Sequence, residues 1–165
     1  MTFKGTIFVE GKADSKFVGD LVKEWFNYSL KSGVEIQETE GKDSLKKFAH
    51  QFQKSTDQGL INLLIFDANG NYQARVKELI VERQALKIQF EVFLFPNNEE
   101  RGDLETLLRR IARNEAVFGC IDTYKRCIEG LQIQNLKSLN EKEKILFTSI
   151  LLRMPGQLKK RRGIT

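Results

Sequence analysis

The chain has few of the residues that cross-link small domains or bind zinc. Its 165 residues include only two cysteines and one histidine. Cys120 and Cys127 lie seven residues apart in one expected helix, which separates their Cα atoms by roughly 10 Å, too far for a disulfide. With a single histidine and no CxxC pair, a zinc site is not indicated. We expect both cysteines to be reduced residues of a core rich in phenylalanine.

The sequence also lacks any apolar run near the roughly 20 residues that cross a bilayer, and Met1 to Lys4 lead directly into a strand-like segment instead of a signal core. We therefore expect a cytoplasmic protein with no membrane partner. The net charge is +5, but residues 159–162 supply four of these charges, which leaves the remainder nearly neutral. The basic tail is either a solvated chain end or a segment that adds sequence-independent attraction to nucleic acid.

Short apolar runs alternate with stretches in which apolar residues recur at helical spacing. The strand-like runs cover residues 6–9, 34–37, 60–66 and 88–95. The run 60–66 is apolar except at Asn62, which is typical of a parallel strand covered on both faces. Further helical stretches follow the last run. This order predicts an α/β fold with a parallel sheet of about four strands flanked by helices, plus extra C-terminal helices, in one domain.

Acidic or amide side chains follow three of the runs, in the pairs Glu10 and Asp14, Asp67 and Asn69, and Asp103 and Glu105. Because parallel strands end at one edge of a sheet, we expect Glu10 and Asp67 to share a cleft there. Oxygen ligands gathered from separate strand ends suit Mg²⁺ or Mn²⁺. Asp14, together with Ser15, and Asp103 are equally suited to cap the helices that start beside them.

Three segments, in this order, resemble the signature segments of the Toprim domain: Phe8 to Asp14, Ile65 to Gly70, and Gly102 to Glu105. The similarity is to the version in OLD-family nucleases and in small stand-alone Toprim-like proteins of unassigned function. It covers about residues 5–115 of a single Toprim-like domain, residues 1–165. The resemblance implies a Toprim-like Rossmannoid sheet, with residues 116–155 as a helical extension and residues 156–165 as a basic tail.

The resemblance also implies roles for the matched residues. Glu10 takes the place of a catalytic glutamate that acts in acid/base chemistry, and Asp67 and Asn69 take the places of the two aspartates of a magnesium-binding D-x-D motif. Asp14 and Glu105 match further acidic positions of the OLD-type site. Asn69 departs from the motif, because its amide oxygen can coordinate Mg²⁺ but brings no charge. The site should therefore hold a cation less tightly.

Asp103 is a further candidate cation ligand. Lys12, Lys16 and Arg101 flank the acidic segments and are candidates to bind phosphate groups, although isolated basic residues more often form a solvated face. The resemblance implies a metal-binding protein, dependent on Mg²⁺ or Mn²⁺, that acts on nucleic acid, DNA more than RNA. Phosphodiester cleavage by a nuclease-like mechanism is the expected reaction.

An alternative hypothesis is that the chain has the Toprim fold but no catalytic activity. A catalytically degenerate Toprim module would bind a partner protein, such as the ATPase that accompanies the Toprim domain in OLD proteins. The chain contains no GxxxxGK[ST] P-loop, so such an ATPase would be a separate chain. A third reading, a receiver-like signalling domain, also uses acidic strand ends. It needs adjacent acidic residues after the first strand and a lysine after a fifth strand, and neither is evident.

Overall fold

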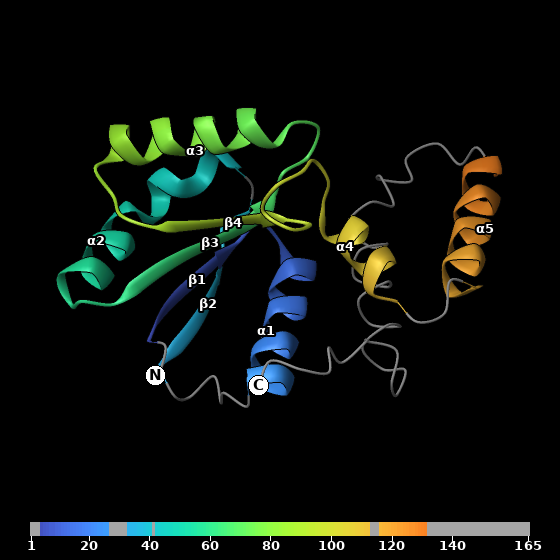
Figure 1. The fold of residues 1–165 in the computed structure, drawn as a ribbon, viewed down its shortest axis with the longest axis horizontal. Helices are drawn as coiled ribbons and strands as arrows, with labels where there is room; N and C mark the ends of the chain where they lie inside the picture. The colour runs from blue at the N-terminus through green and yellow to red at the C-terminus, as the bar shows by residue number, and fades with distance from the viewer. Residues whose placement is uncertain (1–3, 27–32, 41, 113–115, 132–165) are drawn as a thin grey trace. The chain divides into compact units, whose positions relative to one another are not determined.

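The computed structural model describes residues 4–26, 33–40, 42–112 and 116–131 (Figure 1). The chain divides into two compact units, Met1–Thr106 and Leu107–Thr165, which we describe separately. The first unit holds the whole sheet and every candidate site residue. The basic tail, residues 156–165, and residues 132–155 of the expected helical extension lie outside the described residues. Within the described ranges, no helix has both the length and the apolar character needed to span a bilayer.

Four parallel strands form one sheet in the order β2-β1-β3-β4 (Figure 1). They are β1 (Gly5–Val9), β2 (Val34–Glu38), β3 (Ile61–Asp67) and β4 (Glu91–Phe95). β1 pairs with β2 on one side and with β3 on the other, and β3 also pairs with β4. The predicted α/β fold with a parallel four-stranded sheet is therefore confirmed. The fourth strand begins at Glu91, later than the predicted Ile88, since residues 88–90 form a connecting segment.

The helices are α1 (Lys12–Phe26), the 3-10 helix η2 (Lys42–Phe48) that leads into α2 (Ala49–Asp57), α3 (Tyr72–Leu86), α4 (Leu104–Ile111) and α5 (Ala116–Gly130). The prediction that Asp14 and Ser15 precede and cap the first helix is wrong, because α1 already begins at Lys12. Asp14 lies in its first turn, where a carboxylate oxygen accepts a hydrogen bond from the Gly11 amide at 3.1 Å. A carboxylate in the first turn of a helix can accept a hydrogen bond from the amide of the residue that precedes the helix. The acidic residue can therefore lie inside the helix and still cap its start.

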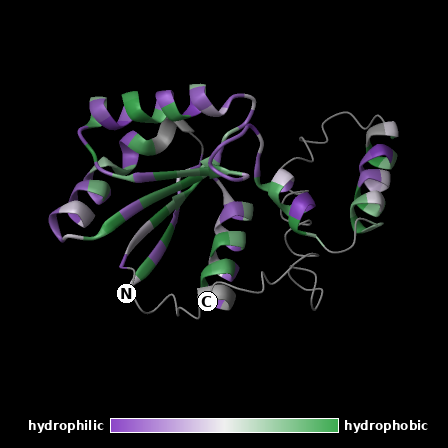
Figure 2. Cartoon of the chain, viewed as in Figure 1, coloured by the Kyte–Doolittle hydropathy of each residue, from purple (hydrophilic) through white to green (hydrophobic). Residues whose placement is uncertain are grey.

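Helices α2 and α3 cover one face of the sheet and α1 covers the other, as Figure 1 shows. Toward α2 and α3, Phe8 of β1 stacks on Phe52 of α2, with ring centroids 4.0 Å apart. Toward α1, Phe17 meets Phe95 edge-on at 5.9 Å. Strands β1, β3 and β4 are accordingly hydrophobic along most of their length, whereas polar residues prevail in β2 (Figure 2). The expectation of phenylalanine-rich packing on both faces is confirmed for the described residues.

Asn62 is the polar exception within β3, and it is buried. Its side-chain nitrogen donates hydrogen bonds to the carbonyl oxygens of Phe52 and Gln89, both at 3.0 Å. These two bonds offset part of the cost of removing the amide group from water, while its side-chain oxygen is buried without a hydrogen-bond partner among the described residues. Asn62 therefore ties α2 and the segment before β4 to the central strand.

In the second unit, Arg109 of α4 forms an ion pair with Asp122 of α5 at 2.6 Å and lies over the Phe118 ring at 4.8 Å. Hydrogen bonding from Arg109 lowers the pKa of Asp122. Cys120 and Cys127 are free, but both are exposed, so the prediction that they belong to the core is wrong. Within α5 the buried positions are instead taken by the bulkier Phe118 and Ile121.

Gly5 permits the close approach of β1 to β3, which yields a test of the fold. A Cβ atom at position 5 would overlap the carbonyl oxygen of Ile61. Gly5→Ala should therefore lower the free energy of unfolding by about 2–3 kcal/mol, measured by urea denaturation. Gly70→Ala is the control, because a Cβ atom at position 70 would have no other atom within 4 Å. Equal stability of the two variants would contradict this account of the β1–β3 pairing.

Candidate functional site

The strand order places a topological switch point between β1 and β3. From β1 the chain crosses through α1 to β2 on one side, and from β3 it crosses through α3 to β4 on the other side. Helices α1 and α3 cover opposite faces of the sheet (Figure 1). In open α/β sheets, ligands bind outside the carboxyl ends of the strands at such a point. Glu10 directly follows β1 and Asp67 ends β3, so the two acidic residues flank the switch point.

Asp67 is buried at this edge. One of its carboxylate oxygens accepts a hydrogen bond from the Leu104 amide, the first of α4, at 3.0 Å. The amide groups at a helix N-terminus favour a negative charge. The segment after Asp67 is fixed as well, because Asn69 and Gly102 exchange two backbone hydrogen bonds of 2.7 and 2.9 Å. The carboxylate of Asp67 is therefore held between β3 and the start of α4.

Asn69 has an exposed side chain and a left-handed backbone, with φ of +54°. Its side-chain nitrogen lies 3.4 Å from the carbonyl oxygen of Asp67, a long hydrogen bond. Asparagine is one of the few residues other than glycine that adopt this conformation readily. The turn geometry therefore gives a backbone reason for asparagine at the position where the D-x-D motif has its second aspartate.

Glu10 contacts an arginine that the sequence reasoning missed. Nη2 of Arg75, in the first turn of α3, donates to a carboxylate oxygen of Glu10 at 2.6 Å, and Nη1 donates to Glu78 at 2.9 Å. The Arg75 side chain is only 6% exposed, against 22% for Glu10. Its guanidinium lies over the Phe66 ring, 5.4 Å from the centroid. The sequence contained one indication that Arg75 would be buried. Arg75 lies one helical turn before the apolar residue Leu79, and both residues are on the inner side of α3.

The remaining candidate ligands have structural roles at helix starts. Asp14 bonds the Gly11 amide, and Asp103 accepts hydrogen bonds from the amide and hydroxyl groups of Thr106 at 2.8 and 2.6 Å, which makes it the N-cap of α4. Glu105 is half-buried in the first turn of α4. Across the described residues, no three Asp, Glu, His or Cys side chains are grouped in a way that could hold a metal ion. The acidic residues thus share an edge of the sheet without forming a finished metal cage.

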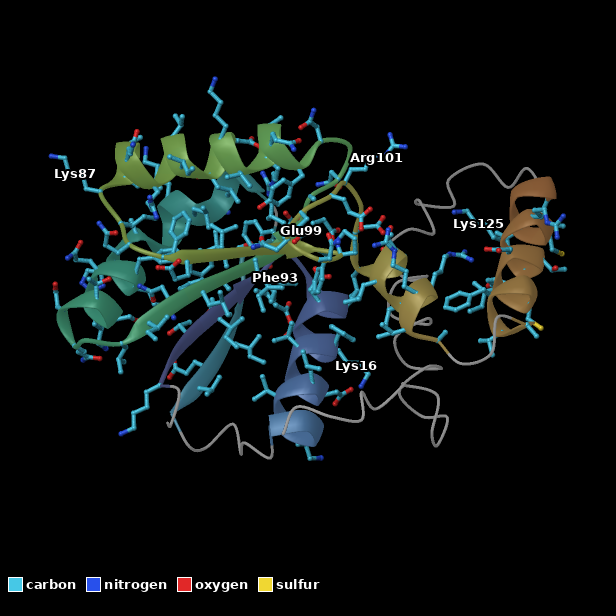
Figure 3. The ribbon with its side chains drawn as sticks, in the orientation of Figure 1. Lys16, Lys87, Phe93, Glu99, Arg101 and Lys125 are labelled. Atoms are coloured by element: carbon cyan, nitrogen blue, oxygen red, sulfur yellow. The ribbon has the colours of Figure 1, made fainter. Side chains whose placement is uncertain are left out.

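The three basic candidates are all exposed. Lys16 pairs with Asp20 on the same helix at 3.0 Å, and it lies on the outer side of α1 (Figure 3). Lys12 opens that helix, and Arg101 lies on the loop after β4 (Figure 3). Long exposed side chains of this kind can reach a bound phosphate group, but they are not built into the edge as Arg75 is. Arg75, in contrast, contacts the candidate catalytic acid Glu10 directly.

The capping role of Asp103 can be separated from a role as cation ligand. Asp103→Ala should lower the free energy of unfolding by about 1 kcal/mol, because the Thr106 amide loses its acceptor. Asp103→Ser retains an oxygen that can cap α4, so its stability in urea denaturation should stay close to that of the wild type. Both variants should keep the wild-type affinity for Mn²⁺. A loss of Mn²⁺ affinity in Asp103→Ser would show that the carboxylate binds the cation instead.

Comparison with known proteins gives one family. A family model described as "Protein of unknown function (DUF3226)" matches residues 4–161. No curated protein and no solved structure gives a significant match. The matched range includes all four strands, the switch point with Glu10 and Asp67, and Arg75. Because the model covers nearly the whole chain, the protein belongs to the DUF3226 family.

Proposed function

We propose that the protein is a Toprim-like, Mg²⁺- or Mn²⁺-dependent enzyme that acts on nucleic acid by cleaving phosphodiester bonds. The observation that carries the proposal is the position of Glu10 and Asp67 on the two sides of the β1/β3 switch point. Open α/β sheets bind their ligands at this place. Two acidic residues at this place fit a ligand-binding role, in addition to the contacts that they make with the Leu104 amide and with Arg75.

The donor atoms at this edge suit the proposed cation. Asp67, Asn69 and Glu105 offer carboxylate or amide oxygens, which Mg²⁺ and Mn²⁺ prefer over nitrogen and sulfur. When bound, the cation would polarise a phosphodiester oxygen and offset the charge that develops on the leaving oxygen. Asp67 would anchor it, with the carboxylate oriented by the Leu104 amide. Glu10 would move a proton to or from the reacting oxygen.

The exposed basic residues fit a nucleic-acid substrate in this proposal. Lys12, Lys16 and Arg101 would make phosphate contacts that carry no sequence information. DNA is the substrate that the Toprim resemblance favours over RNA. The proposed compartment is the cytoplasm, and the free, exposed Cys120 and Cys127 are consistent with a reducing environment.

A second candidate function is a degenerate Toprim module that binds a partner protein, such as a separate ATPase chain. Two observations favour it. The carboxylate of Glu10 is engaged by Arg75, and Asn69 brings no charge to the site. In this reading the Glu10–Arg75 pair is a structural link between β1 and α3, and the switch point has no bound cation.

A cleavage assay separates the two candidates. With Mn²⁺, the wild-type protein should cut DNA, and Asp67→Asn should remove at least about 99% of the rate, because the cation loses its anchoring charge. Asn69→Asp should raise the rate, since it adds a carboxylate beside Asp67. Aspartate, like asparagine, can adopt the left-handed backbone conformation of this position. Cleavage is followed by gel electrophoresis of plasmid and single-stranded DNA.

Asn71→Asp is the matched control for the added charge. Asn71 caps α3 through its side-chain oxygen, and an aspartate retains that hydrogen bond. The control should therefore leave the cleavage rate near that of the wild type. If neither the wild type nor Asn69→Asp cuts DNA with Mn²⁺ present, the enzymatic proposal falls and the partner-binding function takes its place.

A further inference from the structure

We propose that Arg75 is an internal counter-ion that holds Glu10 away from the cation site, so that a divalent cation gains Glu10 only by displacing Arg75. The inference rests on the proposed function, which places the cation at Asp67, and it adds Glu10 as a further ligand of that cation. It adds a residue from outside the three Toprim-like segments and a mechanism that controls cation affinity.

The contacts of Arg75 show how strongly it engages Glu10. The guanidinium carries a positive charge, and its side chain is 6% exposed. A buried cation is tolerated only when it is paired. The distance of 2.6 Å to Glu10 is that of a strong, charge-assisted hydrogen bond. The ring of Phe66 beneath the guanidinium keeps it over the end of β3.

The register of the sheet shows why the ion pair keeps Glu10 and Asp67 apart. Val9 pairs with Ile65, so Glu10 stands beside Phe66, one residue before Asp67. Neighbouring side chains of a strand leave it on opposite faces. Phe66 packs in the core under α2 and α3, and Glu10 reaches Arg75 of α3. The Asp67 carboxylate is instead bonded at the start of α4. Glu10 must therefore leave Arg75 before it can join Asp67 at one cation.

Glu78 makes this exchange feasible. It holds the other terminal nitrogen of Arg75 at 2.9 Å, and its side chain is 45% exposed. When Glu10 turns away, Arg75 keeps one anionic partner, so no buried charge is left unpaired. In this exchange Glu10 loses its contact with the positive charge of Arg75. The cation takes the place of that charge and so offsets the cost of the exchange.

The test is a Mn²⁺ titration by calorimetry on purified full-length protein. The variants are Arg75→Gln, which removes the charge, Arg75→Lys, which keeps it, and Glu78→Gln, which leaves the Glu10–Arg75 contact in place but removes the second anionic partner of Arg75. Arg75→Gln should bind Mn²⁺ at least about tenfold more tightly than the wild type. Arg75→Lys should stay within about threefold of the wild type. Glu78→Gln should bind Mn²⁺ more weakly than the wild type, because Arg75 then has no anionic partner left when Glu10 leaves. Circular dichroism establishes that each variant is folded.

A second pair of variants separates the counter-ion from a structural link. In a Glu10→Gln background, Arg75→Gln should leave the Mn²⁺ affinity unchanged within about twofold, because Arg75 then has no carboxylate to withhold. An equal gain in both backgrounds overturns the inference. The inference is also overturned if the wild type binds Mn²⁺ through Asp67 and Arg75→Gln binds Mn²⁺ with equal affinity. The proposed function would stand in that case. If neither the wild type nor Arg75→Gln binds Mn²⁺, the proposed cation site falls together with the inference.

Discussion

Strands β1 and β3 pair directly in the centre of the sheet, and the rest of the site depends on this contact. Gly5 allows the two backbones to approach, and the register continues to Val9 opposite Ile65. This pairing brings the ends of two strands that are far apart in the sequence to neighbouring positions. Because the chain then crosses to β2 and β4 on opposite faces, Glu10 and Asp67 stand at the point where such sheets bind ligands.

The stability of the fold does not by itself explain why position 75, beside Glu10, is a buried arginine. An aliphatic side chain at position 75 could pack on Phe66 without the cost of removing a charge from water. The arginine instead joins α3 to the end of β1 through an ion pair and a ring contact. The proposal that a cation can replace this counter-ion gives the buried charge a function.

The parts of the structure that depend on local sequence could be predicted. Apolar runs indicated the four strands, because the alternation of apolar runs with helical spacing is a property of a few neighbouring residues. The ion pair between Glu10 and Arg75 could not be predicted, since 65 residues separate its members and tertiary packing alone brings them together. The exposure of Cys120 and Cys127 was missed for a related reason: the apolar stripe of a helix does not specify which of its residues will be covered.

The central claim is that a divalent cation binds between Glu10 and Asp67 at the β1/β3 switch point. A crystal structure of the protein with Mn²⁺, with the metal located by its anomalous scattering, tests it most directly. The account predicts a Mn²⁺ peak coordinated by Asp67, with the Glu10 carboxylate turned from Arg75 toward the metal and Arg75 still bound to Glu78. A structure at millimolar Mn²⁺ with no metal at this edge, and with Glu10 still bound to Arg75, would contradict it.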